Sequence, residues 1–523
     1  MKTVALALLA LVVACHEAVK PEEKPAAEAR AAADAGAAAI PDAGVATPGA
    51  DGGSPAQAAA PKPLPGEEAA LGAQPGLLPL SAFDAPVARI EKLPNGLQVW
   101  LIERKGDGIE SITLLSRGGG ATDPQGKPGA ASLTAALMET GAAGRSQTQL
   151  AAEADAIGAA LSVGASQEAL AVSASAMATQ LQGMVKLLSD VALRPTLAEA
   201  EFARVQKQRE AALLAQRAEP GVGAQLAFQS AVYGQNLLSR PVSGTLASVK
   251  AMKLADVKAF YNTLTPSRAV LVAVGGAKAD DVLSSLRKAF GGWKGGGGKL
   301  AAPPDAHVPA ERPRLVLVDF PGKPQSVLLV GQPSVPRSSP DYLALEALNS
   351  VLGGSFTSRL NQNLREVHGY SYGAGSRFSF GLGPGAFVAS SSVKTDVTGA
   401  AVGEMLKEIE RATNEPLTQE ELDKARALIS YRLVETLSHA DSLSRAIAQS
   451  WLYGLPPDEY RSWVPRLRAL TPQTVQAAVK RALDPAHLTI TIAGDKAKVL
   501  PQLAGLSLPA PQLRDAEGAL AKQ

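Results

Sequence analysis

The chain has 523 residues, with Lys+Arg 51 against Asp+Glu 49 and a formal net charge of +2. This length exceeds what one hydrophobic core usually organises, so we expect two or more core-forming units. The basic residues are not gathered into a block that would suit a phosphate backbone, and the composition therefore argues against a nucleic-acid partner.

The first residues have the layout of a secretion signal. Lys2 precedes the run VALALLALVVA, which is too short to span a bilayer as a helix. Cys15, the one cysteine of the chain, follows, and VVAC resembles the bacterial lipobox, in which the cysteine becomes the lipidated first residue. His16 stands where an aspartate often signals inner-membrane retention. We expect a lipoprotein-type signal peptide over 1–15 and a chain lipid-anchored in the bacterial cell envelope, at the outer membrane facing the periplasm; an ordinary signal peptide with an incidental cysteine is the alternative.

Residues 16–86 contain hardly a large apolar side chain, so they cannot bury enough surface to offset their ordering entropy, and we predict a disordered Ala/Pro-rich tether. Folded structure begins near ARIEKLPNGLQVWLIER, where Asn95-Gly96 predicts a β-hairpin. Apolar periodicity then predicts helices over 130–141, 148–161, 177–193 and 197–220, a buried strand over 267–276 and a helix over 278–293.

A Gly/Pro-rich linker at 293–313 separates this part from a second run of similar patterns. Strands are predicted over 314–320, 325–333 and 385–393, with a helix over 339–354 between them. The closing PAHLTITIAGDKAK matches PSRAVLVAVGGAK, so that Pro485 and Pro266 occupy equivalent places. A repeat this long indicates a duplicated domain. We expect an α+β protein whose halves, 87–292 and 314–510, form a clamshell, followed by a C-terminal tail at 511–523.

Several segments resemble the insulinase-like metallopeptidases, the family of pitrilysin and the mitochondrial processing peptidases. The most specific is GGSFTSRLNQNLREVHGYSYG; others are LPNGLQVWLIE and LTPQTVQAAVKRALDPAHLTITIAGD. The resemblance covers about residues 86 to 510. It implies two homologous α/β-sandwich halves, each an antiparallel sheet covered by helices.

Active members of this family carry His-x-x-Glu-His on a helix after the first hairpin, where the histidines bind zinc and the glutamate activates water. Here Ser132, Ala135 and Ala136 stand at the three positions, and Ala211 or Ala212, beside Glu210, stands where a later glutamate completes the site. No two of the five histidines fall within a helical turn of each other. We therefore expect a degenerate zinc motif in the first half and no metal or other cofactor in this chain. Ser132 has no neighbouring base to make it a nucleophile.

The second half keeps the family's other residues. Phe356, Leu360, Leu364 and Val367 recur at helical spacing and predict an amphipathic helix that stops at Gly369, with Arg365 in its last turn. Tyr370 and Tyr372 then fall on one face of a strand. The resemblance implies that an arginine and a tyrosine seven positions apart, here Arg365 and Tyr372, reach a substrate bound at zinc; arginine offers a permanent charge and tyrosine a hydroxyl that can donate to an oxyanion.

In bacterial two-subunit relatives the zinc motif and the Arg/Tyr pair are divided between two chains. The sequence thus favours a zinc-free subunit, inactive alone, that supplies Arg365 and Tyr372 to a peptide held at the zinc of an insulinase-like partner. Arg359, in SRL, is either a structural residue or a peptide-binding residue, and the structural role is favoured. The alternative is a non-catalytic structural or peptide-binding lipoprotein of the same fold, in which Arg365 and Tyr372 compensate the helix dipole and pack.

Overall fold

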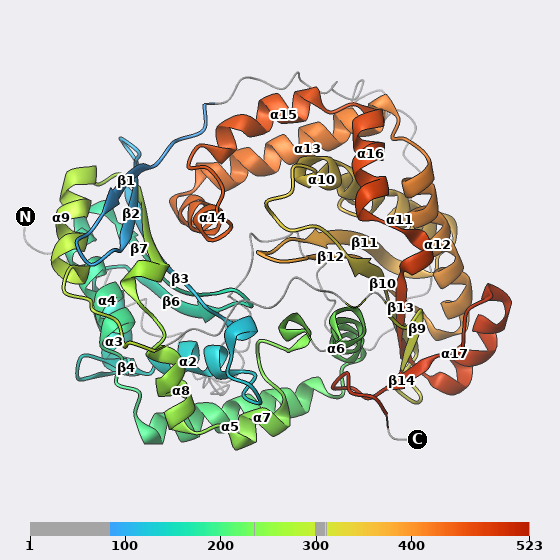
Figure 1. The fold of residues 1–523 in the computed structure, drawn as a ribbon, viewed down its shortest axis with the longest axis horizontal. Helices are drawn as coiled ribbons and strands as arrows, with labels where there is room; N and C mark the ends of the chain where they lie inside the picture. Colours follow the sequence, from blue (N-terminus) through green and yellow to red (C-terminus); the bar gives the residue numbers. More distant parts are fainter. Residues whose placement is uncertain (1–83, 235, 299–308, 310, 522–523) are drawn as a thin grey trace, which may run out of the picture. The chain divides into compact units, whose positions relative to one another are not determined.

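The computed structural model describes residues 84–234, 236–298, 309 and 311–521 (Figure 1). The predicted signal peptide, Cys15 and the tether up to residue 83 lie outside the described residues. Within the described ranges, no helix combines the length and the apolar character needed to cross a membrane.

The first half is built on a six-stranded sheet in the order β1-β2-β8-β3-β7-β6. Its strands are β1 (Arg89–Lys92), β2 (Gln98–Glu103), β3 (Ile109–Arg117), β6 (Ala160–Ala165), β7 (Ala169–Met177) and β8 (Ala269–Gly275). β2 and β8 are parallel, and the other neighbours are antiparallel. The predicted hairpin is confirmed, since β1 and β2 pair across Asn95-Gly96, where Gly96 has a φ of +90° that a residue with a side chain rarely adopts.

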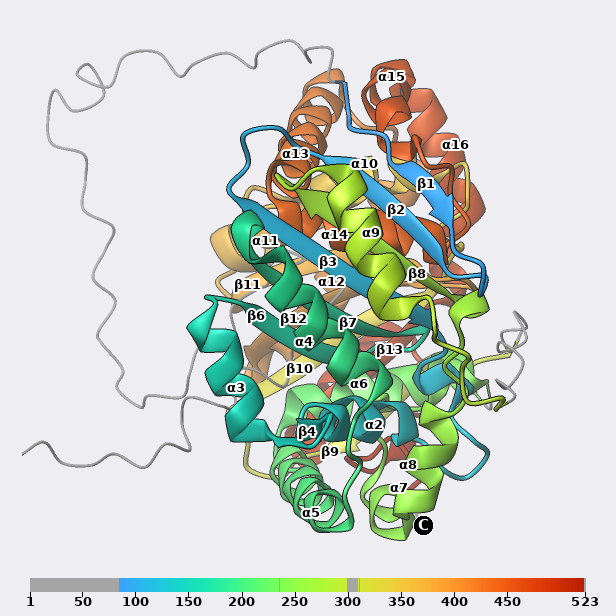
Figure 2. The ribbon, with the colours of Figure 1, turned by 90° about the vertical axis from the view of Figure 1, so that its left-hand side faces the viewer.

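Helices cover this sheet, with α4 and α9 over one face (Figure 2). The helices of this half are α2 (Ala130–Met138), α3 (Gln147–Ala156), α4 (Leu181–Leu193), α5 (Glu199–Gln216), α6 (Pro220–Tyr233), α7 (Leu246–Ala251), α8 (Leu254–Tyr261) and α9 (Ala279–Phe290). The predicted helix over 148–161 was too long, because Gly158 takes a φ of +61° and the chain enters β6. A two-stranded sheet, β4 (Gly141–Ala142) with β5 (Arg145–Ser146), precedes α3.

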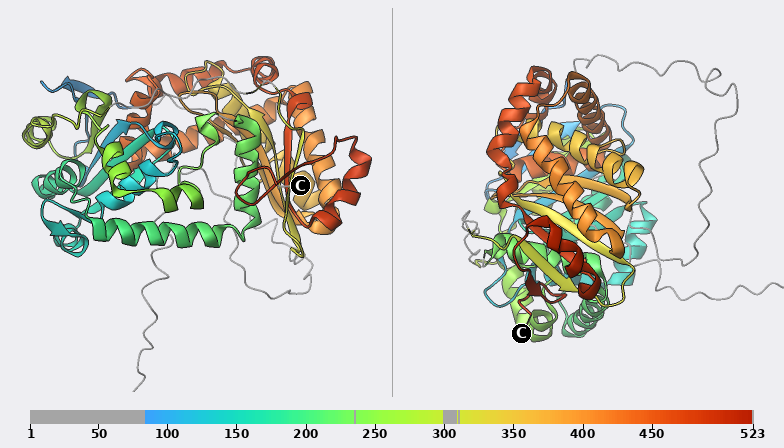
Figure 3. Two further views of the ribbon diagram at one scale, coloured as in Figure 1. Left: turned by 60° about the horizontal axis from the view of Figure 1, so that its bottom comes forward. Right: turned by 90° about the vertical axis from the view of Figure 1, so that its right-hand side faces the viewer.

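The second half has a six-stranded sheet in the order β11-β12-β10-β13-β9-β14. Its strands are β9 (Leu315–Asp319), β10 (Gln325–Pro333), β11 (Ser371–Ser379), β12 (Ala386–Lys394), β13 (Thr489–Gly494) and β14 (Gln512–Arg514). The helices of this half are α10 (Tyr342–Leu352), α11 (Arg359–Asn361), α12 (Thr398–Asn414), α13 (Gln419–Ser438), α14 (Ala440–Leu452), α15 (Trp463–Ala469), α16 (Pro472–Ala482) and α17 (Lys496–Leu503). Of these, α12 and α17 lie in front of the sheet in the right-hand view of Figure 3.

The two sheets repeat one topology, which confirms the predicted duplication. β2, β8, β3, β7 and β6 correspond in order and direction to β9, β13, β10, β12 and β11. Pro266 and Pro485 open equivalent 3₁₀ turns before β8 and β13. The predicted α+β class with two homologous halves is therefore correct, whereas the sheets are mixed rather than purely antiparallel, because the β2–β8 and β9–β13 pairs are parallel. The boundaries of the predicted domains stay predictions.

Each half also contributes one helix to the other half's sheet. α6 packs its apolar face on the second sheet, where Phe228 is buried in one cluster with Val316 and Leu329. α14 packs on the first sheet, and the Ser444 hydroxyl lies 3.1 Å from the hydroxyls of both Ser111 and Thr113. Because separating the halves would expose both helix faces, this reciprocal packing stabilises the pair of halves as one unit.

Candidate functional site

The segment that carries Arg365 and Tyr372 starts at a glycine turn pressed against β11. A Cβ on Gly353 would lie 2.0 Å from the Ser376 nitrogen, so only glycine fits there. Asn349 reinforces the contact, since its side-chain oxygen accepts a hydrogen bond of 2.8 Å from the Ser376 hydroxyl. The turn therefore holds the following helix against the edge strand of the second sheet.

The helix after this turn differs from the predicted one. It begins at Arg359, so that Phe356 lies before it, and from Gln362 to Val367 it widens into a π-helix. Leu360 and Leu364 are fully buried as predicted, but Phe356 and Val367 are 66% and 73% exposed, so the expectation that they share the apolar face was wrong. π-Helical turns are rare in proteins, and those that occur often lie at functional sites. The predicted stop is confirmed, because Gly369 has a φ of +62°.

Arg365 lies on the π-helical turn with its guanidinium at the surface. The guanidinium carbon sits 4.7 Å from the centroid of the Phe356 ring. Among the described residues the carboxylate within ion-pair distance is that of the neighbouring Glu366, at 3.4 Å. The side chain is 38% exposed. Arg365 thus keeps donors available for an external group, and its guanidinium packs on the exposed ring of Phe356.

The two tyrosines of the segment have different surroundings. Tyr370 precedes β11, packs against the core and stacks on His368 with ring centroids 4.9 Å apart. Tyr372 lies on β11, the edge strand of the sheet, and is 83% exposed. A bulge between Ser371 and Ala374 interrupts the pairing there, and bulges re-aim side chains. Tyr370 and Tyr372 therefore do not share one environment, and Tyr372 presents its side chain to solvent.

Polar contacts anchor the outer side of the π-helix to α12. The Nε2 atom of His368 lies 3.8 Å from a Glu404 carboxylate oxygen, and the Asn363 amide donates to Glu404 at 3.2 Å and to Glu408 at 3.0 Å. The pKa of Glu404 lies below its ordinary value, chiefly because Lys407 donates to it and also because Asn363 does. These contacts fix the turn on which Arg365 is carried.

Arg359 is held inside the protein. Its Nε and Nη2 atoms each donate to the carboxylate of Glu421 at 2.8 Å, and its side chain is 9% exposed. Burial alone would raise the pKa of Glu421, but the hydrogen bonds from Arg359 and from the Thr418 backbone hold it below its usual value. A bidentate pair at such low exposure favours the structural interpretation of Arg359 over the peptide-binding one.

The segment predicted to carry the degenerate zinc motif is helix α2 (Ala130–Met138). Ala135 is buried, and Ser132 and Ala136 are half-buried on one face of the helix. The end of α2 is tied to the edge strand β6, because the Val163 backbone donates to the Glu139 carboxylate at 2.7 Å. On α5, Glu210 is half-buried while Ala211 and Ala212 are exposed.

These residues do not fit zinc, because a hydroxyl and two methyl groups replace two imidazoles and a carboxylate. Within the described part of the chain, no three His, Cys, Asp or Glu side chains gather in a group that could hold a metal ion. The zinc-free character of this chain stays a prediction that metal analysis tests.

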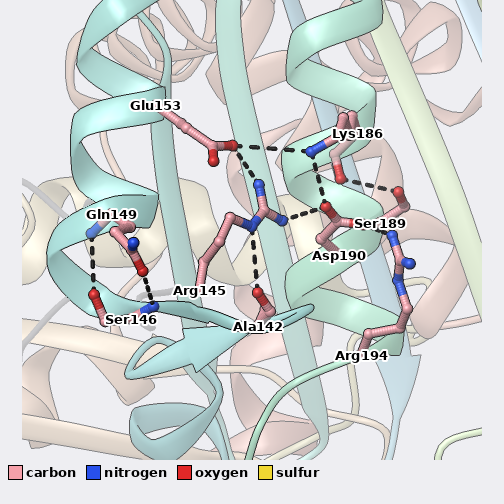
Figure 4. Close-up of polar contacts among 9 residues, drawn as sticks. All are labelled: Ala142, Arg145, Ser146, Gln149, Glu153, Lys186, Ser189, Asp190 and Arg194. Atoms are coloured by element: carbon pink, nitrogen blue, oxygen red, sulfur yellow. Dashed lines mark hydrogen bonds and ion pairs between the residues drawn. The ribbon is translucent and has the colours of Figure 1, made fainter.

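A charged cluster that the sequence did not predict joins α3, α4 and β5 (Figure 4). The Arg145 guanidinium lies between the carboxylates of Glu153 and Asp190, and Asp190 is also paired with Lys186 and Arg194. The Asp190 side chain is 1% exposed. Lys186 and Arg194 lie four residues before and after Asp190, a spacing that could have indicated these two pairs, whereas Arg145 and Glu153 come from separate segments.

Comparison with known proteins agrees with this geometry. The model of the family described as "Insulinase (Peptidase family M16)" matches residues 99–246, and that of the "Peptidase M16 inactive domain" matches residues 251–429. An uncharacterized zinc protease of Streptomyces coelicolor is 24% identical over 405 residues, covering 75% of this chain and 86% of its own. A protein of Helicobacter pylori named non-peptidase homolog YmxG is 24% identical over 399 residues, covering 74% and 89%.

Solved structures share the fold. A crystal structure of a peptidase M16 inactive domain from Pseudomonas fluorescens superposes with a TM-score of 0.72 at 24% identity, over 78% of this chain and 98% of that one. A protease from Helicobacter pylori superposes with a TM-score of 0.74 at 17% identity, over 78% and 100%. With a duplicated topology, a substituted zinc helix and matches in both halves, the chain belongs to the insulinase family of peptidases, family M16, and is similar to its non-peptidase homologues.

Proposed function

We propose that this chain is the zinc-free subunit of a two-chain insulinase-like peptidase, in which Arg365 and Tyr372 contact a peptide held at the zinc of a partner subunit. The observation that carries the proposal is the exposure of both side chains: Tyr372 is 83% exposed on an edge strand, and the Arg365 guanidinium stands at the surface beside one exposed carboxylate. Large exposed aromatic and cationic groups of this kind are typical of binding surfaces.

The chemistry of the pair suits the carbonyl oxygen of a scissile peptide bond. A tyrosine hydroxyl and a guanidinium are both hydrogen-bond donors; among the described residues the guanidinium has one ion pair, with the neighbouring Glu366 at 3.4 Å, and Tyr372 is 83% exposed. Donors aimed at the position where negative charge develops lower the barrier of acyl transfer. The substitutions at Ser132, Ala135 and Ala136 leave these donors without a metal in their own chain, so the proposal places zinc in the partner.

The proposal also includes a place in the cell. The lipobox-like VVAC favours a mature protein tethered through Cys15 at the outer membrane and facing the periplasm, with the Ala/Pro-rich segment as spacer. The zinc-bearing partner would then be a protein of the same compartment.

The test is turnover of a peptide by the complex of this chain with a zinc-bearing insulinase-like homologue, normalised to heterodimer isolated by size-exclusion chromatography. Arg365→Ala and Tyr372→Phe are each expected to lower turnover by about 10²-fold to 10³-fold without reducing assembly. Arg377→Ala, at an exposed arginine of the same strand, is the matched control and is expected to leave turnover unchanged. If both variants assemble and retain normal turnover, the chain is instead a structural or peptide-binding lipoprotein of this fold.

A further inference from the structure

The first half contains a groove that the proposed peptidase function does not use. It has a volume of about 780 Å³ and lies between α4, α8, α9 and the glycine-rich segment at 291–296. That segment is built closely onto the end of α8: a Cβ on Gly296 would lie 2.5 Å from the Asn262 Cα atom, and Gly295 takes a φ of +77°. Glycine is required at both positions, because a side chain would prevent this close packing. The packing fixes the backbone of the segment and thereby holds Trp293 and Lys294 at the groove.

The groove is lined by an excess of positive charge. Lys186 and Arg194 of α4, Lys288 of α9 and Lys294 line it together with one carboxylate, that of Asp190. Burial alone would raise the pKa of Asp190, but ion pairs with Arg194 and Lys186 hold it below its usual value. Arg145 pairs with the same carboxylate (Figure 4). The single negative charge of the lining is therefore already shared among three cations.

Two of the cations have no counterion among the residues that the structure describes. Lys288 and Lys294 form no ion pair with any carboxylate of the described residues, and both are exposed. Like charges gathered around a concave surface raise the local potential and attract an anion.

Aromatic and aliphatic surfaces complete the lining. The Tyr261 hydroxyl donates to the Ala192 carbonyl at 3.0 Å, which fixes its ring at the groove, and the half-buried Trp293 packs against the core of the first half. Val185, Leu193 and Leu264 add apolar contacts. A ligand that fills the space would place an apolar body on these surfaces and its anionic group among the lysines.

We propose that this groove binds a phosphate ester with an aromatic or apolar body. The phosphate group is placed near Lys288 and Lys294, and the body contacts Trp293 and Tyr261. A free organic phosphate and the headgroup of a phospholipid share this chemistry, and the experiment distinguishes them.

The probe is 1-naphthyl phosphate, titrated into the purified full chain by isothermal titration calorimetry, with 1-naphthol and inorganic phosphate as its separate parts. The phosphate ester is expected to bind more tightly than either part, with an affinity that falls as ionic strength rises. Lys288→Gln with Lys294→Gln is expected to raise the Kd about tenfold, equivalent to about 1.4 kcal/mol. Both lysines are exposed, so the double variant is expected to fold normally, which its melting temperature checks.

The matched control is Lys207→Gln with Lys250→Gln, which removes two exposed lysines of α5 and α7 that do not line the groove and is expected to leave the Kd unchanged. Flotation of the Cys15→Ser full chain, which lacks the proposed lipid anchor, with vesicles of equimolar phosphatidylcholine and phosphatidic acid separates the two sources. Flotation lost in the Lys288/Lys294 variant identifies a lipid headgroup, and calorimetric binding without flotation identifies a free organic phosphate. Absence of heat with 1-naphthyl phosphate, or equal affinities of wild type and the Lys288/Lys294 variant, would overturn the proposal.

Discussion

The Arg365 guanidinium lies over the ring of Phe356, 4.7 Å from its centroid. Phe356 is 66% exposed and contributes little to the core. We therefore expect its ring to orient the Arg365 side chain rather than to stabilise the fold.

Replacing Phe356 with alanine is expected to lower the turnover of the heterodimer about twofold to fivefold, since an exposed cation–π contact contributes about 0.5–1 kcal/mol. The melting temperature of the isolated chain is expected to stay within about 2 °C of the wild type. Phe356→Trp retains the aromatic face and is expected to restore turnover. A large loss of melting temperature in Phe356→Ala, or normal turnover, would show that the ring does not position Arg365.

The bidentate pair of Arg359 and Glu421 predicts a stability effect. Arg359→Met removes both hydrogen bonds and leaves a carboxylate that is 26% exposed without its partner, so we expect a loss of about 2 kcal/mol in the free energy of unfolding, below the cost for a fully buried pair. Urea unfolding of the isolated chain measures it. Lys424→Met, which breaks the exposed pair with Glu420, is the control and is expected to cost less than about 0.5 kcal/mol.

This pair also has a pH dependence. The folded-state pKa of Glu421 is below its usual value, so its contribution is present above the unfolded pKa of about 4.3 and is lost as pH falls through the folded pKa. The stability difference between wild type and Arg359→Met is therefore expected to shrink below about pH 4. A difference that stays constant down to acid unfolding would contradict the pairing.

Glu110, on β3, predicts the opposite pH dependence. It is 2% exposed, and burial, reinforced by Asp107 and Glu103, raises its pKa to about 7 although the Ala277 backbone donates to it. Because the folded state holds the proton more tightly, its contribution is full below the unfolded pKa of about 4.3 and is lost as pH rises to about 7.

Glu110→Gln keeps the hydrogen-bond acceptor and removes the titration. We expect the variant to match the wild type near pH 4.5 and to exceed it at pH 8 by an amount on the order of 3 kcal/mol. Chemical unfolding at several pH values measures this. Parallel stability profiles of the two proteins would show that Glu110 does not titrate in this range.

Local patterns predicted most of the elements. The Asn95-Gly96 hairpin, the strand over 267–276 and the paired Pro266 and Pro485 follow from periodicity and turn chemistry, which depend on neighbours in the sequence. The exchange of α6 and α14 between the halves has no local pattern, because apolar faces do not specify which sheet covers them.

The sequence likewise predicted some features of the candidate site and missed others. Arg365 and Tyr372 were selected because the family resemblance implies an arginine and a tyrosine seven positions apart, whereas the exposure of Phe356 was missed, because the helix starts at Arg359 and widens after Asn361. Residues three or four positions apart share one face only while the helix keeps its regular 3.6-residue period. In the cluster around Asp190, the spacing of four residues could have indicated the pairs with Lys186 and Arg194, but only tertiary packing brings Arg145 to the same carboxylate.

Anchoring through Cys15 predicts a simple fractionation result. Cys15→Ser is expected to move the protein from the membrane fraction to the soluble fraction, because the variant lacks the cysteine that would carry the acyl chains. A triacylated cysteine anchors a chain far more firmly than one acyl chain does. His16→Ala keeps the cysteine and is the control for changes near the cleavage site. A Cys15→Ser protein that stays in the membrane fraction would mean that another feature holds it there.

The substitutions on α2 predict that the purified chain binds no stoichiometric zinc and cleaves no peptide by itself. Ser132 and Ala136 are one helical turn apart and both half-buried, so Ser132→His with Ala136→His would place two imidazoles on one face of α2. We expect this double variant to gain measurable zinc affinity while the wild type has none, because the backbone of the motif is retained and its ligands are not. Elemental analysis after dialysis against a weak chelator measures both. About one zinc per wild-type chain would contradict this account of α2 and would place a metal site where no ligand is expected.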